Sequence, residues 1–272
     1  HAASALAKNK FLAVSGYAGS GKTTLLKWLA IQCCKEFEEP ELHVLTGYLP
    51  IYFKLRDYRS QRLPSLGTLA KSLSPSLRDS EVEAMVEKYA LRNKILLLCD
   101  GVDEISDTDQ GQFWTWVTRV LRGSPGIRVI VSGRPHVLRR VSDRVAFKLY
   151  EIARMPLAAV EHFIDKWHQA AAQTKRREYG ESPEVTSRRL IKKLGKNRTI
   201  HELATNPLMC GMICLLHWEK WRYLPVKKLD VFRQCARVLL YSRDKERGAA
   251  SSDYPDLNEE ERLVRKSTRL NS

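Results

Sequence analysis

Eight residues near the start of the chain have the types and spacing of a phosphate-binding loop. Residues 16–23 read GYAGSGKT, a complete G-x-x-x-x-G-K-T pattern behind the apolar run Phe11–Val14 and ahead of a helical stretch. In a strand, glycine loop and helix of this kind, backbone N–H groups point at phosphates. The pattern predicts Lys22 at the β/γ-phosphates and the Thr23 hydroxyl on Mg²⁺. The expected phosphate-binding residues are Gly16, Ala18, Gly19, Ser20, Gly21, Lys22, Thr23 and Thr24.

An acidic cluster follows the apolar run at 94–99. It reads Asp100-Gly101-Val102-Asp103-Glu104. A carboxylate at the carboxyl end of a parallel strand can hold Mg²⁺ beside a phosphate-binding loop, and we assign that role to Asp100. A carboxylate about one turn further on can polarise the attacking water, with Glu104 as the first choice and Asp103 as the second. Because burying an unpaired carboxylate costs several kcal/mol, Asp100 needs either Mg²⁺ or a donor partner.

Alternating strands and helices must position these residues in the first half of the chain. Apolar runs predict strands at 11–15, 49–55, 94–99, 128–132 and 147–152. Helical spacing of apolar residues predicts helices at 22–37, 79–89 and 113–121, with a loop and a short helix between 64 and 76. This order predicts an α/β fold with a parallel sheet in three layers, as in P-loop NTPases.

The second half of the chain shows almost only helical periodicity. Apolar stripes predict helices around 160–167, 190–194, 206–216 and 229–241, and the polar stretch 178–187 is expected to be a loop. The predicted domains are a nucleotide-binding domain at 1–155 and a helical domain at 156–250. Residues 251–272 are predicted to be a tail that is either non-native or disordered. The sequence has no initiator Met, so we expect a fragment or a processed chain.

The composition is that of an ordinary soluble globular protein. The chain has 272 residues, of which 43% are hydrophobic and 28% are charged. No apolar run reaches the roughly 18 residues that a membrane span needs, and we find no signal peptide. The six cysteines form no CxxC pair, which favours reduced, buried cysteines and a cytoplasmic protein.

The net charge of +15 permits binding to nucleic acid or to an acidic surface. The basic residues are scattered, with local concentrations at 175–177 and 188–198, and we interpret them as a solvated basic face. The chain also lacks the interleaved aromatic and basic residues that stack bases. Nucleic acid is therefore a partner that the sequence permits but does not favour.

Four motifs in order resemble the NACHT domain of the STAND class of signal-transduction P-loop ATPases, over roughly residues 9–245. They are the loop GYAGSGKTTLL, the acidic strand ILLLCDGVDE, the strand RVIVSGRP and the helix TNPLMCGMICLLH. Two weaker matches are LPIYFKLRD and LYEIARMPLAAVEHFIDKW. The combination of DGVDE, SGRP and NPL is far more specific than the phosphate-binding loop alone.

The resemblance implies roles for two further residues. Arg134 becomes the arginine that contacts the γ-phosphate, where a guanidinium stabilises charge on a transferring phosphoryl group. Pro207 would pack against the adenine ring, although a proline at the first position of a helix is equally well explained by helix geometry. Gly133 departs from the family, since relatives often have Ser or Cys there. The family's winged-helix histidine, which contacts the β-phosphate, lies outside these 272 residues.

The resemblance also implies a function. A NACHT switch binds ATP or ADP with Mg²⁺, forms a homo-oligomer when activated, and signals in innate immunity or anti-phage defence. We expect slow ATP hydrolysis in this fragment. Two alternatives stay open: a nucleic-acid-dependent P-loop ATPase, and a nucleotide-binding scaffold with little turnover. A GTPase is disfavoured because no N-K-x-D tetrapeptide is present, and an ABC ATPase because there is no LSGGQ-type signature.

Overall fold

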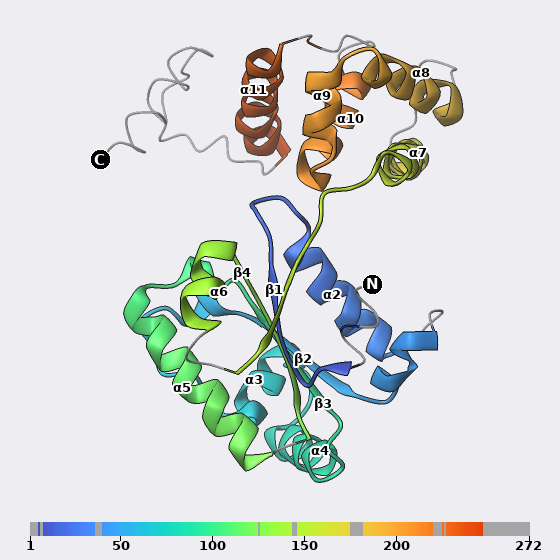
Figure 1. Cartoon of the computed structure of the whole chain (residues 1–272). Coiled ribbons are helices and arrows are strands. Elements are labelled where there is room, and N and C mark those ends of the chain that lie inside the picture. Colours follow the sequence, from blue (N-terminus) through green and yellow to red (C-terminus); the bar gives the residue numbers. More distant parts are fainter. Residues whose placement is uncertain are drawn as a thin grey trace, which may run out of the picture. The chain divides into compact units, whose positions relative to one another are not determined.

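The computed structural model describes residues 8–35, 40–124, 126–142, 146–174, 182–219 and 227–246, together with Ala5 and Pro225. The chain divides into two compact units (Figure 1). The first unit is His1–Met155 with Asn206–Leu208, and the second is Pro156–Thr205 with Met209–Ser272. The predicted tail at 251–272 lies outside the described residues.

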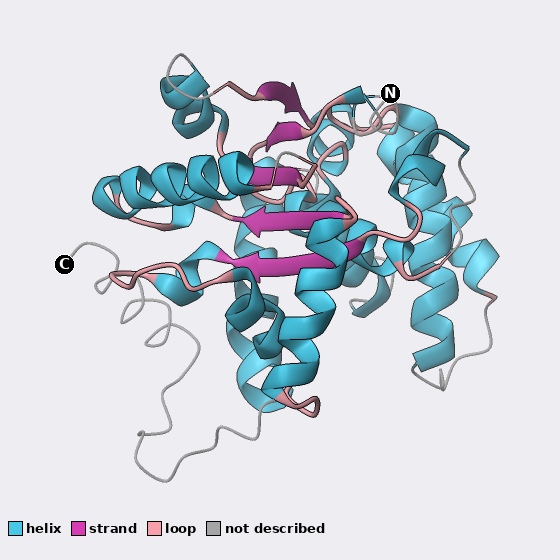
Figure 2. Ribbon diagram, turned by 90° about the horizontal axis from the view of Figure 1, so that it is seen from below, coloured by secondary structure: helices cyan, strands magenta, loops and turns pink. Residues whose placement is uncertain are grey.

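A five-stranded sheet is the centre of the first unit, and its strand order is β2-β3-β4-β1-β5. All strand pairs are parallel, and Figure 2 shows the strands lying side by side. The strands are β1 (Phe11–Ser15), β2 (Leu49–Lys54), β3 (Ile95–Asp100), β4 (Arg128–Gly133) and β5 (Lys148–Glu151). Because the strands are parallel, their carboxyl ends meet at one edge, where the phosphate-binding loop follows β1 and the acidic cluster follows β3.

Helices cover both faces of this sheet, which gives the predicted three layers. Successive residues of β3 alternate between two cores, since Leu96 and Leu98 pack on one face while Ile95, Leu97 and Cys99 pack on the other. The first core also contains residues of α2 (Lys22–Cys33) and the 3₁₀ turn η1 (Pro40–Leu45). The opposite core contains residues of α3 (Leu66–Leu73), α4 (Asp79–Leu91), α5 (Asp107–Gly123) and α6 (Pro135–Ser142). The α/β fold class is confirmed.

Helices are the only regular elements among the described residues of the second unit. Its helices are α7 (Leu157–Thr174), α8 (Pro183–Gly195), α9 (Arg198–Ala204), α10 (Pro207–Glu219) and α11 (Lys228–Glu246). Apolar side chains of these helices are buried, among them Val160, Leu190 and Ile213. The first two residues of α10 cluster with the first unit. None of the helices in the described part of the chain has the length and apolar character that a membrane span requires.

Several predicted boundaries are wrong. The first helix ends at Cys33, because Cys34 and Lys35 lie in a turn, and residues 36–39 lie outside the described residues. The helix predicted at 113–121 starts at Asp107, where the Ser106 side chain accepts a hydrogen bond from the backbone N–H of Asp109.

The predicted loop at 178–187 and the predicted burial of the cysteines also need correction. Of the loop predicted at 178–187, residues 183–187 belong to α8, which begins with a Ser182 cap and Pro183 at its first position, while residues 178–181 lie outside the described residues. Five of the six cysteines are buried as expected, but Cys34 is exposed. The short helices α6 and α9 were not predicted.

Candidate nucleotide-binding site

The loop between β1 and α2 has the backbone of a phosphate cradle. Gly19 and Gly21 have φ angles of 76° and 93°, in the left-handed region that favours glycine. Gly21 is the N-cap of α2 and brings no capping side chain, and the first turn of α2 has no acidic residue. The first N–H groups of a helix have no partner within the helix, so this end of α2 can receive an anion.

Two side chains of this loop are placed for a phosphate ligand. The Lys22 ammonium donates to the carbonyl oxygens of Gly16 at 2.6 Å and Tyr17 at 3.1 Å, which holds it over the loop. Burial lowers the pKa of Lys22, and the charges of Asp103 and Asp100 oppose that shift. The Ser20 hydroxyl is buried without a hydrogen-bond partner among the described residues. A buried orphan hydroxyl beside a lysine fits an oxyanion.

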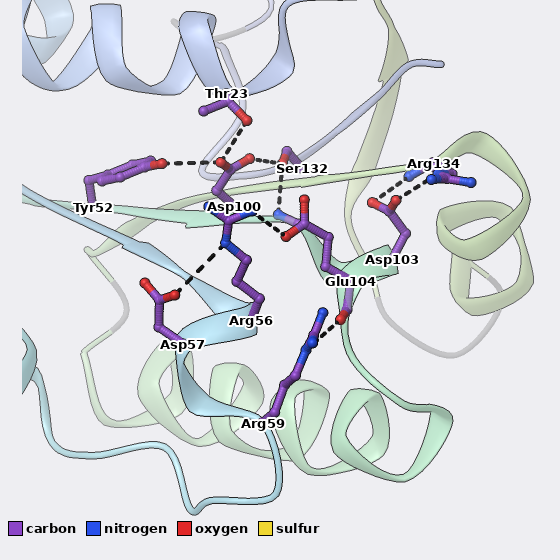
Figure 3. Close-up of polar contacts among 11 residues, drawn as sticks. Thr23, Tyr52, Arg56, Asp57, Arg59, Asp100, Asp103, Glu104, Ser132 and Arg134 are labelled. Atoms are coloured by element: carbon purple, nitrogen blue, oxygen red, sulfur yellow. Dashed lines mark hydrogen bonds and ion pairs between the residues drawn. The ribbon is translucent and has the colours of Figure 1, made fainter. Parts of the chain in front are cut away.

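Asp100 ends β3 and is 7% exposed. Hydroxyl groups from three other elements surround its carboxylate (Figure 3). The Thr23 hydroxyl donates to Oδ2 at 2.8 Å, the Tyr52 hydroxyl to the same oxygen at 3.1 Å, and the Ser132 hydroxyl to Oδ1 at 2.5 Å. The Ser132 hydroxyl oxygen in turn accepts from the backbone N–H of Gly101 at 3.0 Å. These donors meet the requirement that the sequence placed on Asp100.

Tyr52 is a donor to Asp100 in this arrangement. Burial raises the pKa of the Tyr52 phenol, and the charge of Asp100 and the hydrogen bond to it raise it further. The phenol therefore keeps its proton, and the hydrogen bond to the carboxylate persists.

Asp103 and Glu104 lie on the 3₁₀ turn η3 (Val102–Glu104) but have different partners. The Asp103 side chain is 9% exposed, and its carboxylate accepts from the Nε of Arg134 at 2.9 Å and from the backbone N–H of Arg134 at 3.1 Å. Arg134 itself is 56% exposed and directly follows β4. The pair ties the turn after β3 to the turn after β4.

Glu104 is more open to solvent, with a side chain that is 43% exposed. Its Oε2 lies 3.5 Å from a terminal nitrogen of Arg56, and its backbone carbonyl accepts from the Nε of Arg59 at 3.0 Å (Figure 3). Arg56 is on the 3₁₀ turn η2 (Leu55–Tyr58), which follows β2. Its Nε also lies 3.8 Å from Oδ1 of Asp57. Glu104 is thus the more accessible of the two candidate bases.

The Asn206–Leu208 segment contacts the phosphate-binding loop within the first unit. The Asn206 amide donates to the carbonyl of Ala18 at 3.1 Å, and the backbone N–H of Leu208 donates to the carbonyl of Gly19 at 3.2 Å. A Cβ atom on Gly19 would lie 2.6 Å from the Cβ of Leu208. Gly19 therefore meets two demands, a left-handed backbone and close packing. Pro207, the predicted adenine contact, lies between these two residues.

The donor set of the site fits magnesium and a nucleotide. The Thr23 hydroxyl and the Asp100 carboxylate lie at hydrogen-bond distance from each other, and their oxygens could serve as ligands beside the phosphate cradle. Magnesium in proteins is usually bound by one or two carboxylates together with substrate phosphates. No group of three or more His, Cys, Asp or Glu side chains that could hold a metal ion occurs among the described residues.

The structure brings most of the predicted site residues to one edge of the sheet. The loop residues, Asp100, Asp103, Glu104 and Arg134 gather there, and Pro207 stands between Asn206 and Leu208, which contact the loop. Sequence reasoning missed Tyr52, Ser132 and Arg56. All three stand in segments that carry the family resemblance, Ser132 in SGRP and both Tyr52 and Arg56 in LPIYFKLRD, but no local pattern indicates that their side chains reach the acidic cluster.

Comparison with known proteins gives one family and several solved structures. A model of the NACHT domain family matches residues 10–171. No curated protein matches the chain. The replication initiator DnaA bound to AMPPCP and single-stranded DNA is similar at 18% identity and TM-score 0.40, over 91% of this chain and 62% of that chain.

Two more solved structures are similar at the same level. The C. elegans protein PCH-2 matches at 14% identity and TM-score 0.44, over 82% of this chain and 61% of that one. The AAA domain of FIGL-1 in complex with ADP matches at 17% identity and TM-score 0.41, over 97% and 78%. The chain spans about three fifths of the length of the first two structures. Likenesses this distant do not bear on function.

Proposed function

The chain belongs to the NACHT domain family, and on that basis we propose that it binds ATP with Mg²⁺ and hydrolyses it slowly as a molecular switch. The observation that carries the proposal is the hydrogen bond between the Thr23 hydroxyl and the Asp100 carboxylate, at the end of a glycine loop that also contains Lys22. Oxygen ligands for a metal, an ammonium group and a helix N-terminus converge there. Phosphoryl transfer requires groups of these kinds, which position the phosphates and stabilise their charge.

The side chains divide the chemistry among them. Lys22, the loop N–H groups and the N-terminus of α2 bind and orient the phosphates. Thr23 and Asp100 would hold Mg²⁺, which neutralises phosphate charge when it is bound. Glu104 accepts a proton from the attacking water, and its exposed carboxylate can reach solvent. Arg134, which is half-exposed, supplies a guanidinium for charge that develops on the γ-phosphate.

The switch itself is proposed from the family. In this proposal ADP holds a closed form, and exchange for ATP releases a form that assembles into a homo-oligomer. The output is signalling in innate immunity or anti-phage defence, in the cytoplasm. Pro207 contacts the adenine ring, and the hydrogen bonds of its neighbours Asn206 and Leu208 to the loop support this placement.

Two other functions would use the same site. A nucleic-acid-dependent ATPase is favoured by the net charge of +15 alone, and it predicts an affinity for DNA that falls steeply with salt. A scaffold with little turnover predicts tight nucleotide binding without measurable hydrolysis. Titration with single-stranded DNA at two salt concentrations and a turnover assay separate these functions from the switch.

Lys22→Ala tests the nucleotide site directly. We expect the variant to lose at least ~100-fold in affinity for ATP, because it removes the ammonium group that reaches the β/γ-phosphates. The measurement is a titration with labelled ATP, ADP and GTP, with and without Mg²⁺. The wild type should prefer the adenine nucleotides.

The matched control is Lys27→Ala. Lys27 is an exposed lysine on the same helix as Lys22, so this variant carries the same change in charge and should bind as the wild type does. Equal ATP affinity in Lys22→Ala and the wild type would refute the nucleotide site.

A further inference from the structure

The Asp100 carboxylate is held from two sides by hydroxyl groups outside the phosphate-binding loop. Ser132, on β4, donates to Oδ1 at 2.5 Å, and Tyr52, on β2, donates to Oδ2 at 3.1 Å (Figure 3). Both oxygens of the carboxylate therefore have fixed donors before Thr23 is counted. A carboxylate held in this way cannot rotate about its terminal bond without breaking a hydrogen bond.

Strand register explains how Tyr52 reaches the carboxylate. β2 and β3 are parallel neighbours, and Tyr52 pairs with Leu98 while Lys54 pairs with Asp100. Alternate residues of a strand point to the same face, so Tyr52, Leu98 and Asp100 share the face that α2 covers. The long phenol side chain spans the two-residue offset along the strands. A phenylalanine in its place would keep the ring and lose only the donor.

We propose that Tyr52 is a positioning residue which, together with Ser132, fixes the Asp100 carboxylate for the metal ion that accompanies the nucleotide. The inference rests on the proposed function, because it assigns Asp100 to the magnesium site. Tyr52 touches neither the nucleotide nor the metal in this proposal. It acts through the orientation of Asp100, so its loss should weaken binding of the metal and leave the metal-free contacts of the nucleotide unchanged.

The test is Tyr52→Phe in the whole chain, with labelled ADP as the probe. Affinity for ADP is measured in EDTA and then across a series of free Mg²⁺ concentrations. We expect an unchanged affinity in EDTA and a rise of about tenfold in the Mg²⁺ concentration at half effect. That is the size expected for one lost hydrogen bond to a charged group. Ser132→Ala removes the donor on the other side and should move the midpoint in the same direction.

Tyr48→Phe is the matched control. Tyr48 directly precedes β2, at the opposite end of that strand from the Asp100 side chain. Its hydroxyl accepts a hydrogen bond from the Nε of Arg128 at 3.2 Å. This variant loses a tyrosine hydroxyl and one hydrogen bond, as Tyr52→Phe does, but should keep the wild-type midpoint. Thermal unfolding of both variants without ligand checks that they fold.

Three results would overturn the inference. One is an unchanged Mg²⁺ midpoint in Tyr52→Phe. Another is an equal loss of affinity with and without Mg²⁺, which would mean a general structural role. The last is the same midpoint shift in Tyr48→Phe. If the wild type binds no ADP under any condition, the proposed function fails and takes the inference with it, whereas a normal wild type with an unaffected Tyr52→Phe refutes the inference alone.

Discussion

At the scale of single residues, the two adjacent carboxylates of the acidic cluster have different surroundings. Asp103 is nearly buried and tied to Arg134 by both its side chain and its backbone N–H. Glu104 is far more exposed, and its ion pair among the described residues is a long one, to Arg56 at 3.5 Å. A group that must exchange a proton with water needs to reach water and to be free of tight partners. We therefore retain Glu104 as the proposed base and interpret Asp103 as the anchor of Arg134.

Glu104→Gln should separate binding from turnover. The amide keeps the size and polarity of the side chain and removes the ability to take a proton. We expect ATP affinity close to that of the wild type and hydrolysis slower by ~100-fold, a typical loss for a general base. The measurement is phosphate release under saturating ATP, beside a binding titration.

Glu87→Gln is the control for this experiment. Glu87 is an exposed glutamate on α4 without a hydrogen bond or ion pair among the described residues. The Glu87→Gln variant should have the ATP affinity and the hydrolysis rate of the wild type. Normal turnover in Glu104→Gln would remove Glu104 from the mechanism and return the role to Asp103 or to another group.

Residues of the site differ in how far the sequence reveals them. The phosphate-binding loop is contiguous, so its glycines, Lys22 and Thr23 can be identified from spacing alone. Asp100 can be identified because a carboxylate ends an apolar run. Tyr52 cannot, because its role depends on β2 lying beside β3 in one particular register, and the sequence of β2 does not encode its neighbour. Long-range register is the information that local patterns lack.

At the scale of elements, a local apolar pattern distinguishes the elements that the sequence predicts from those that it misses. β3 is buried on both faces and reads as an unbroken apolar run, so its position could be predicted. α9 has only seven residues, too few for an apolar stripe to repeat. α5 was predicted from Phe113 because its first turns, from Asp107 to Gln112, are polar and carry no apolar period. Its start is marked instead by the N-cap residue Ser106.

Ser106→Ala tests that cap. The Ser106 side chain accepts from the backbone N–H of Asp109 at 3.2 Å at the start of α5. Its loss leaves one donor of the first turn without a partner in the protein, and we expect the free energy of unfolding to fall by ~1 kcal/mol. The measurement is urea denaturation. Ser106→Asp keeps an acceptor at the N-cap and should be as stable as the wild type. An unchanged free energy of unfolding in Ser106→Ala would show that the cap does not stabilise α5.

At the scale of the whole molecule, the chain changes from a sheet-based unit to a helical one between Met155 and Pro156. The family match runs across this point, from residue 10 to residue 171. It therefore confirms the predicted resemblance to NACHT domains but does not locate the boundary between the two domains. The domain ranges 1–155 and 156–250 stay a prediction, and limited proteolysis can test them.

Trypsin should cut after Arg154 before it cuts within α4 or α5. This arginine is exposed and lies in the segment 152–156, which is neither helix nor strand and separates β5 from α7. Proteases bind extended chain, so exposed basic residues inside α4 or α5 should be cut later. We expect an early fragment of residues 1–154, identified by its intact mass. Arg154→Gln removes the site and should abolish that fragment while the other products remain. If bonds inside α4 or α5 of the wild type are instead cut as early as the bond after Arg154, residues 1–155 do not form the folded domain that we predict, because a folded α/β unit would protect those bonds.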